Sequence, residues 1–167
     1  MQIPALVQAS EIAQTLTSEA VSALFNSTAK VPVAEGLLRF GVIVRPLLEE
    51  LLTTPADDET KTHAAAVLFD LGSKAGLPHL EFVLESGKDF LIAANYLAKA
   101  HVSEAANAIE RILRKWDVRA DPYTANALID DLRRLRGVPD DLKQKLMQEY
   151  PVAMRPALAK LLDETTP

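Results

Sequence analysis

Apolar residues recur along the chain at steps of three and four, the spacing that places side chains on one face of an α-helix. Ile12, Leu16, Ala20, Val21, Leu24 and Phe25 form the first such stripe. The alternation of apolar and polar residues that is typical of a half-buried strand is nearly absent, and no Asn-Gly or Asp-Gly hairpin signal occurs. The pattern therefore predicts an all-α fold of about nine or ten short helices without a sheet.

Proline and glycine interrupt the pattern at short intervals, which limits the predicted helices to about 10 to 16 residues each. Acidic residues mark where several of them begin, because a carboxylate there accepts from free backbone N–H groups and meets the positive end of the helix dipole. The three starts predicted in this way are Asp57-Asp58-Glu59, Asp121-Pro122 and Pro139-Asp140-Asp141.

The stripes repeat about every 30 residues, in units of two helices, a period typical of stacked helical repeats. The first helices of the units are expected around residues 33–40, 63–71, 92–97 and 124–129. The second helices are expected around residues 46–52, 80–84, 109–113 and 142–146. Small residues in the first helices allow a neighbouring helix to approach closely, so Ala65, Ala66, Ala94 and Ala125 are expected to face the core.

Three segments resemble short HEAT-like repeats, which pair an alanine-rich helix with a leucine-rich one across a Gly/Pro turn. They are Ala64-Ala65-Ala66-Val67-Leu68-Phe69-Asp70-Leu71-Gly72, Leu77-Pro78-His79-Leu80 and Ala93-Ala94-Asn95-Tyr96-Leu97. The resemblance implies a right-handed α–α superhelix, a solenoid, of about four helix pairs with capping helices. We expect one domain over residues 1–167, with an N-terminal cap in 1–31, repeats in 32–149 and a C-terminal cap in 150–167. The cap helices themselves are expected at Glu11–Ser27 and Pro151–Glu164.

Composition narrows the classes of function. The chain has 167 residues, 49% of them apolar, no cysteine and a net charge of −5. The lack of cysteine excludes disulfides, thiolate metal sites and a cysteine nucleophile. The acidic balance argues against generic binding to nucleic acid or to anionic membranes. Neither a basic start followed by an apolar run nor an uninterrupted apolar span is found, so we expect a cytoplasmic protein without a membrane segment.

Catalytic motifs are absent from the sequence. It contains no glycine-rich phosphate loop, no H-E-x-x-H and no G-x-S-x-G. His63, His79 and His101 lie 16 and 22 residues apart, so no helix presents two of them on one face. The sequence therefore predicts no catalytic residue, no metal and no cofactor.

One candidate binding surface is acidic. Residues 1–86 carry a net charge of −6, whereas residues 87–167 carry +1. The second helices of HEAT-like stacks line a concave surface that usually binds the partner. The repeat register places one row of polar residues beside the apolar stripes of these helices: Glu49, Glu50, Glu81, Glu85, Glu110 and Arg114. Because the row is largely acidic at its N-terminal end, we expect a basic partner protein.

The alternative surface is a basic ridge in the second half, made of Arg111, Lys115, Trp116, Arg119, Arg133, Arg134 and Arg136. Cations near helix C-termini are favoured by the helix dipole, which explains such residues without a ligand. A ridge that holds phosphate, with Trp116 as a stacking surface, is the other interpretation. Trp116 also continues the apolar stripe of Ile109, Ile112 and Leu113, which favours a core position.

These observations favour a non-enzymatic protein–protein interaction module. Several bacterial immunity proteins have HEAT-like folds, so the resemblance implies neutralisation of a basic toxin as one role. It also implies two enzymatic alternatives, a HEAT-like DNA glycosylase, to which Trp116-Asp117 bears a faint likeness, and a HEAT-like bilin lyase subunit. The expected partner is another protein rather than nucleic acid or a membrane, and the sequence leaves the oligomeric state open, with a monomer favoured.

Overall fold

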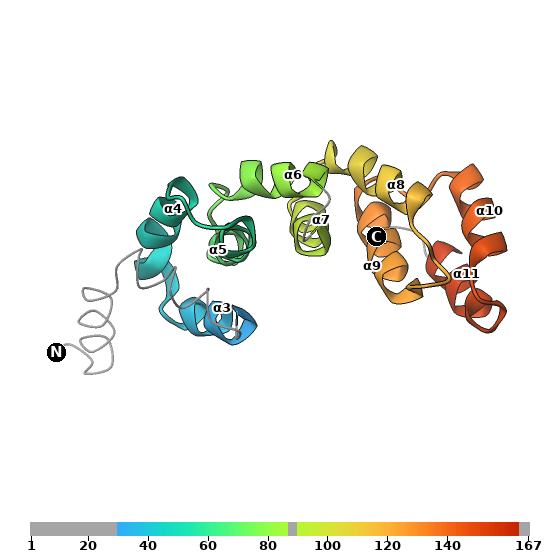
Figure 1. The fold of residues 1–167 in the computed structure, drawn as a ribbon, viewed down its shortest axis with the longest axis horizontal. Helices are drawn as coiled ribbons and strands as arrows, with labels where there is room; N and C mark the ends of the chain where they lie inside the picture. The colour runs from blue at the N-terminus through green and yellow to red at the C-terminus, as the bar shows by residue number, and fades with distance from the viewer. Residues whose placement is uncertain (1–29, 87–89, 164–167) are drawn as a thin grey trace. The chain divides into compact units, whose positions relative to one another are not determined.

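A computed structural model describes residues 30–86 and 90–163 of the chain (Figure 1). These residues form nine α-helices and two short 3₁₀ helices and contain no strand, which confirms the predicted all-α class. None of these helices has the length and apolar character needed to cross a bilayer. The cap helix predicted at Glu11–Ser27 lies outside the described residues.

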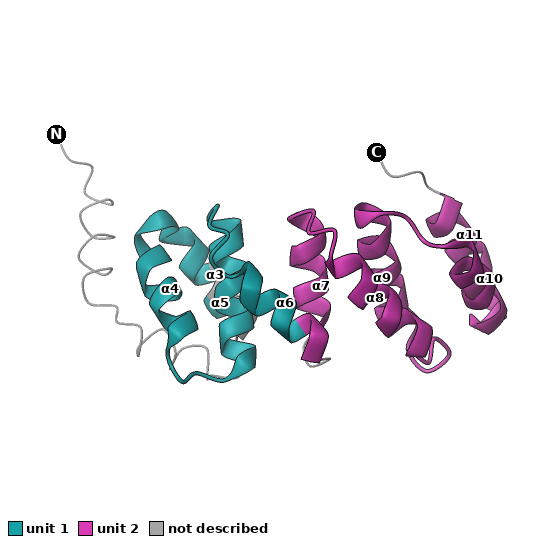
Figure 2. Cartoon of the chain, turned by 90° about the horizontal axis from the view of Figure 1, so that it is seen from above, with its two compact units in different colours: residues 1–83 teal, residues 84–167 magenta. Residues whose placement is uncertain are grey.

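The chain forms two compact units, residues 1–83 and 84–167 (Figure 2), and the division falls within one helix, α6. The first part of the described chain contains α3 (Lys30–Arg39), η1 (Gly41–Val44), α4 (Arg45–Thr53), α5 (Asp58–Asp70) and α6 (Leu77–Ser86). The second part contains α7 (Phe90–Lys99), α8 (Ala105–Lys115), α9 (Pro122–Leu135), α10 (Asp140–Glu149), η2 (Val152–Met154) and α11 (Arg155–Asp163). A helix lies at each of the eight segments predicted between residues 33 and 146, although α3 and α5 end one residue before Phe40 and Leu71, the last residues of their segments.

The predicted acidic helix starts are confirmed. The Asp57 side chain accepts from the Thr60 backbone N–H at 2.9 Å, and Asp121 accepts from the Thr124 N–H at 3.0 Å. Each therefore satisfies one of the backbone donors that a first helical turn leaves free. Helix α10 begins at Asp140, directly after Pro139, with acidic residues in its first turn.

Helices α5 and α7 end in the same way. The second residue past each helix has a positive φ, +81° at Gly72 and +55° at His101. The backbone N–H of the following residue donates to a carbonyl five residues earlier, Ser73 to Leu68 at 2.8 Å and Val102 to Leu97 at 3.0 Å. This is the arrangement that closes many helix C-termini. The two ends lie 29 residues apart, close to the period of the sequence pattern.

In unit 1, α3 and α4 pack against α5 and bury Leu37, Leu48 and Leu51 with Leu68. The alanine face of α5 is in close contact with the turn that follows. A Cβ built on Gly76 would lie 2.5 Å from the Cβ of Ala65, closer than two nonbonded carbon atoms can approach. Ala65 and Ala66 are buried, as predicted.

In unit 2, α9 is the central helix, because α7, α8 and α11 all pack against it. Ala94 of α7 and Ala125 of α9 are fully buried, which confirms their predicted core positions. Tyr150, at the end of α10, is buried as well, and its hydroxyl lies 2.9 Å from Asn126 Oδ1 and 3.2 Å from the Pro122 carbonyl oxygen. In the predicted C-terminal cap, Leu158 and Leu162 of α11 are buried.

Candidate functional site

The acidic row predicted from the sequence is divided between the two units, so its members are described one unit at a time. In unit 1, Glu49, Glu50 and Glu81 are exposed. Glu49 accepts a hydrogen bond from Ser73 Oγ at 3.1 Å. The carboxylates of Glu50 and Glu81 have no hydrogen-bond or ion-pair partner within residues 30–86 and 90–163. Their charges are therefore available to a cationic partner.

Phe82 follows Glu81 on α6, and 58% of its surface is exposed. The start of this helix is held on α5 by His79, whose Nε2 lies 3.3 Å from both Thr62 Oγ1 and the Asp58 carbonyl oxygen. Because the Thr62 hydroxyl itself donates to Asp58, the Nε2 of His79 serves as the donor to both oxygens. We call Glu81 and Phe82 together the α6 surface.

In unit 2 the acidic members of the row have cationic partners in the chain itself. Glu85 forms an ion pair with Arg111, and Glu110 pairs with both Arg114 and Arg136. Arg114 also lies 2.8 Å from Asp141, and the hydrogen bond from its guanidinium holds the pKa of the Asp141 carboxyl below its ordinary value. These ion pairs therefore offset the negative charges of Glu85 and Glu110 within unit 2.

The arginines of α9 in the basic ridge are paired with acidic residues of the same helix. Arg133 is buried and pairs with Asp130 at 3.3 Å. Arg134 pairs with the same Asp130 and lies 3.8 Å from Asp131. Arg136, just past the helix end, donates to Asn107 of α8 in addition to its pair with Glu110. These three cations therefore connect residues of unit 2 to one another.

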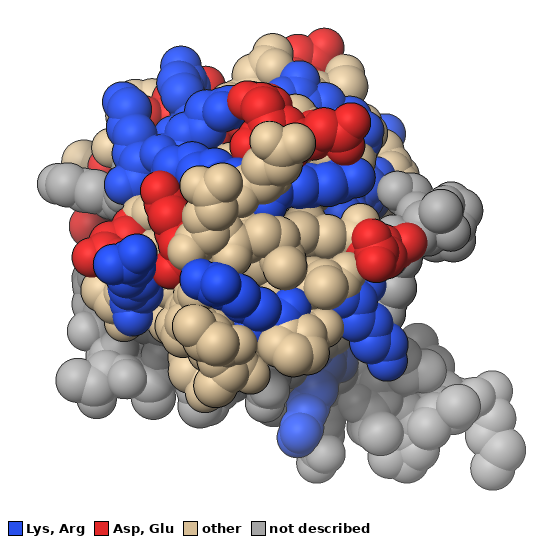
Figure 3. Space-filling view, turned by 90° about the vertical axis from the view of Figure 1, so that its right-hand side faces the viewer, with Lys and Arg blue, Asp and Glu red and all other residues tan. Residues whose placement is uncertain are grey.

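Three further residues of the ridge, Lys115, Trp116 and Arg119, border a cleft at the end of α8. The cleft has a volume of about 550 Å³. Its lining residues come from the end of α8, the connection to α9 and helix α10: Arg114, Lys115, Trp116, Asp117, Val118, Arg119, Lys145 and Glu149. Four of these are cationic and two are acidic. Lys and Arg side chains also gather on the face that Figure 3 shows.

Both acidic residues of this cleft have donors in the chain. Asp117 Oδ1 accepts from the backbone N–H groups of Arg119 and Ala120, at 3.1 and 3.3 Å. Glu149 forms an ion pair with Lys145 at 3.2 Å. Two of the cations, in contrast, keep donors free. Arg119 uses only its Nε, on the Glu149 carbonyl oxygen, and Lys115 has no partner in the part of the chain that the structure describes.

Trp116 has a structural role at the same place. Its ring is half-buried and packs edge-on against Phe90, with 5.4 Å between ring centroids. Its indole Nε1 donates to the Asp121 carbonyl oxygen at 3.1 Å, which fixes the connection between α8 and α9. The core position expected for Trp116 is thus confirmed in part, because the ring also lines the cleft.

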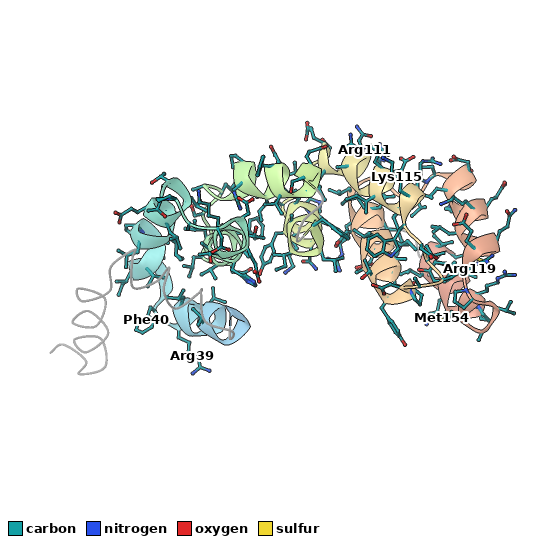
Figure 4. The ribbon with its side chains drawn as sticks, in the orientation of Figure 1. Arg39, Phe40, Arg111, Lys115, Arg119 and Met154 are labelled. Carbon is teal, nitrogen blue, oxygen red and sulfur yellow. The ribbon has the colours of Figure 1, made fainter. Side chains whose placement is uncertain are left out.

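A second, smaller cleft of about 290 Å³ adjoins the first. Lys115 lines both clefts, and the second is completed by Leu84, Glu85, Arg111 and Ile112. Figure 4 shows Arg111 and Lys115 along α8, with Arg119 on the connection that follows it. Lys145 and Glu149 could not be predicted from the sequence pattern, because they reach the first cleft from α10, about 30 positions later in the chain.

The described residues contain no group of three or more His, Asp or Glu side chains placed to hold a metal ion. Comparisons of the chain with family models, with curated proteins and with solved structures each find no match. Support for a function therefore comes from the residues and contacts of the chain itself.

Proposed function

We propose that the chain is a non-enzymatic protein-interaction module that binds a basic partner protein through the α6 surface. The observation that carries this proposal is the presence of two exposed neighbours on α6. The carboxylate of Glu81 has no partner among the described residues, and the ring of the next residue, Phe82, is 58% exposed. Exposed aromatic residues often anchor interfaces by filling a pocket on the partner, while nearby charges select the partner and speed its approach.

The proposed architecture is a right-handed HEAT-like solenoid. Support comes from packing and from helix ends. Within unit 1, α3 packs on α5, and within unit 2, α7 packs on α9 and α9 on α11. Each of these contacts joins the same position in successive helix pairs, as a stack of repeats requires. The matching ends of α5 and α7, and the matching Asp starts of α5 and α9, fit the same repeat.

In a bacterial cell, a module of this kind would serve as an immunity protein that covers a basic toxin in the cytoplasm. The acidic residues of unit 1 suit that role, because complementary charge accelerates capture of the toxin before it acts. The role does not require a catalytic residue, and a tightly bound complex would be enough to block the toxin's own site.

The test is capture of partners from a lysate of the source organism with the immobilised chain, followed by mass spectrometry. We expect a protein with a basic isoelectric point to bind the wild-type chain and to be lost with Glu81→Lys combined with Phe82→Ala. The matched control combines Glu104→Lys with Tyr123→Ala, an exposed carboxylate and an exposed aromatic residue of unit 2. Equal loss with both double variants, or capture unaffected by the α6 variant, would contradict the proposal.

A DNA glycosylase is the second candidate, and one observation favours it: Trp116 and Asp117 both line the cationic cleft. The backbone donors on Asp117 give this residue a local structural role instead, as the acceptor that shapes the turn before α9. Release of bases from alkylated DNA by the wild-type chain, abolished by Asp117→Asn, would establish the glycosylase and overturn the interaction module.

A further inference from the structure

We infer that the two adjoining clefts beside α8 form a docking track for an acidic, partly apolar peptide segment of a partner protein. We call them together the α8 track, defined by Arg111, Ile112, Lys115, Trp116 and Arg119. The track goes beyond the proposed function, because it takes a ligand of opposite charge and shares no residue with the α6 surface. Either site can fail without affecting the other.

Several hydrogen-bond donors of the first cleft have no acceptor within the described part of the chain. Asp117 and Glu149 are the acidic residues of the first cleft, and both already accept from groups of the chain. Lys115 is exposed and unpartnered in the described part of the chain, and the Nη groups of Arg119 make no hydrogen bond there. An incoming carboxylate would therefore meet donors that need not first break an internal ion pair.

The second cleft adds an apolar contact. Ile112 is half-buried in its wall beside the buried Leu84, and Lys115 joins this wall to the first cleft. A peptide whose carboxylate lies against Lys115 and Arg119 would place a neighbouring apolar side chain against Ile112. A simple anion would use only the charged contact, whereas a peptide can use the charged and the apolar contact together.

The same geometry disfavours nucleic acid. A nucleic-acid strand carries a phosphate at every nucleotide, so it binds best along a continuous run of positive charge. The walls of the track carry both signs of charge, because Glu85, Asp117 and Glu149 line the clefts together with the cations. The ring of Trp116 is packed on Phe90 and its Nε1 is hydrogen-bonded, so the indole serves as a fixed wall. Sparse carboxylates in a peptide fit this mixture of charges better than a phosphate backbone does.

The experiment is a selection of random displayed short peptides on the immobilised full chain. We expect the enriched peptides to share acidic residues with one apolar residue at a fixed spacing. Labelled copies of these peptides are then titrated against the wild-type chain, against Lys115→Glu with Arg119→Glu, and against Lys115→Gln alone. The double reversal is expected to weaken binding at least about tenfold, and the single neutral change several-fold, with unchanged far-UV circular dichroism.

The matched control reverses two other cations of unit 2, Lys143→Glu and Lys160→Glu, and should leave binding unchanged. The track would be overturned by a selection that enriches nothing, by enriched peptides without acidic residues, or by equal binding to the Lys115/Arg119 and control variants. Tighter binding of a single-stranded oligonucleotide than of the selected peptides would also overturn it and would assign the track to nucleic acid.

Discussion

At the scale of single residues, the contact between Ala65 and Gly76 determines how closely α5 approaches the following turn. Gly76 is buried, and an added Cβ would lie 2.5 Å from the Ala65 Cβ and 2.6 Å from its Cα. The obstacle is backbone as well as side chain, so no change of rotamer relieves it. The packing of unit 1 therefore requires glycine at this position for space.

Gly76→Ala should accordingly destabilise unit 1 by about 1–3 kcal/mol, the usual cost of overpacking a tight core. Gly36→Ala is a matched control, because nothing lies within 4 Å of a Cβ at this position in α3. Alanine is the better helix former by about 1 kcal/mol, so the control should leave stability equal or higher. Urea denaturation curves measure both variants, and a neutral Gly76→Ala would contradict the close contact.

Asp131 on α9 provides a test by pH. Burial raises the pKa of its carboxyl to about 6, against opposing effects of Arg134 and Lys99. Because the folded-state pKa lies above the ordinary value of about 3.9, the folded chain binds the proton more tightly than the unfolded chain does. The stability that this tighter proton binding adds to the folded state is fully present below about pH 4 and is lost as pH rises through 6.

Asp131→Asn should therefore stabilise the chain at pH 8, where the wild-type carboxylate is charged and buried, by up to about 3 kcal/mol at 1.36 kcal/mol per pKa unit. The gain should shrink toward pH 4, where the wild-type residue is protonated. Thermal denaturation of both proteins from pH 4 to 8 measures the difference. A gain that does not depend on pH would show that the carboxyl titrates normally.

At the scale of elements, α5 and α7 end in equivalent turns with different residues. Gly72 adopts its positive φ without steric cost, whereas His101 has a φ of +55° with a side chain attached. His101→Gly should therefore raise stability by about 0.5–1 kcal/mol, and Gly72→Ala should lower it by a similar amount. Opposite shifts of the denaturation midpoint are expected, and a destabilising His101→Gly would mean that its side chain makes a contact that outweighs the strain.

Helix positions could be predicted from the sequence because local chemistry determines them. Asp57 and Asp121 place an acceptor before a helical run, and both cap the predicted helix. Alanine at 65, 94 and 125 is buried because only small side chains allow close contact between helices.

The pairing of charged side chains could not be predicted in this way. Arg136 reaches Glu110 from a segment 26 positions away, and Arg111 reaches Glu85 over the same separation. Both arginines belonged to the predicted ridge, and both glutamates to the predicted row. Which charged side chains remain without an ion-pair partner depends on the distances between helices, and these distances cannot be read from the sequence pattern. The clefts beside α8 could not be predicted for the same reason.

At the scale of the whole molecule, the chain carries its negative charge unevenly. Residues 1–86 have a net charge of −6 and residues 87–167 a net charge of +1. Glu81 in unit 1 keeps an unpartnered negative charge, while Lys115 in unit 2 keeps an unpartnered positive one among the described residues. The two proposed surfaces should therefore attract ligands of opposite sign.

Ionic strength should act on both surfaces, and the variants should separate them. Salt screens charges beyond about 10 Å at 0.1 M, so the association rate of a basic partner with the wild-type chain should fall as salt is added. For the basic partner, Glu81→Lys should slow association at low salt and make the association rate less dependent on salt. Lys115→Glu should leave the salt dependence of this rate unchanged or slightly steeper. For a selected acidic peptide the roles are reversed: Lys115→Glu should slow association and reduce its salt dependence, whereas Glu81→Lys should leave that dependence unchanged or slightly steeper. Stopped-flow or surface-binding kinetics between 20 and 500 mM salt measure all four combinations. If both variants change the binding of one ligand in the same way, that ligand responds to something other than the sign of the local charge, and the assignment of two separate surfaces fails.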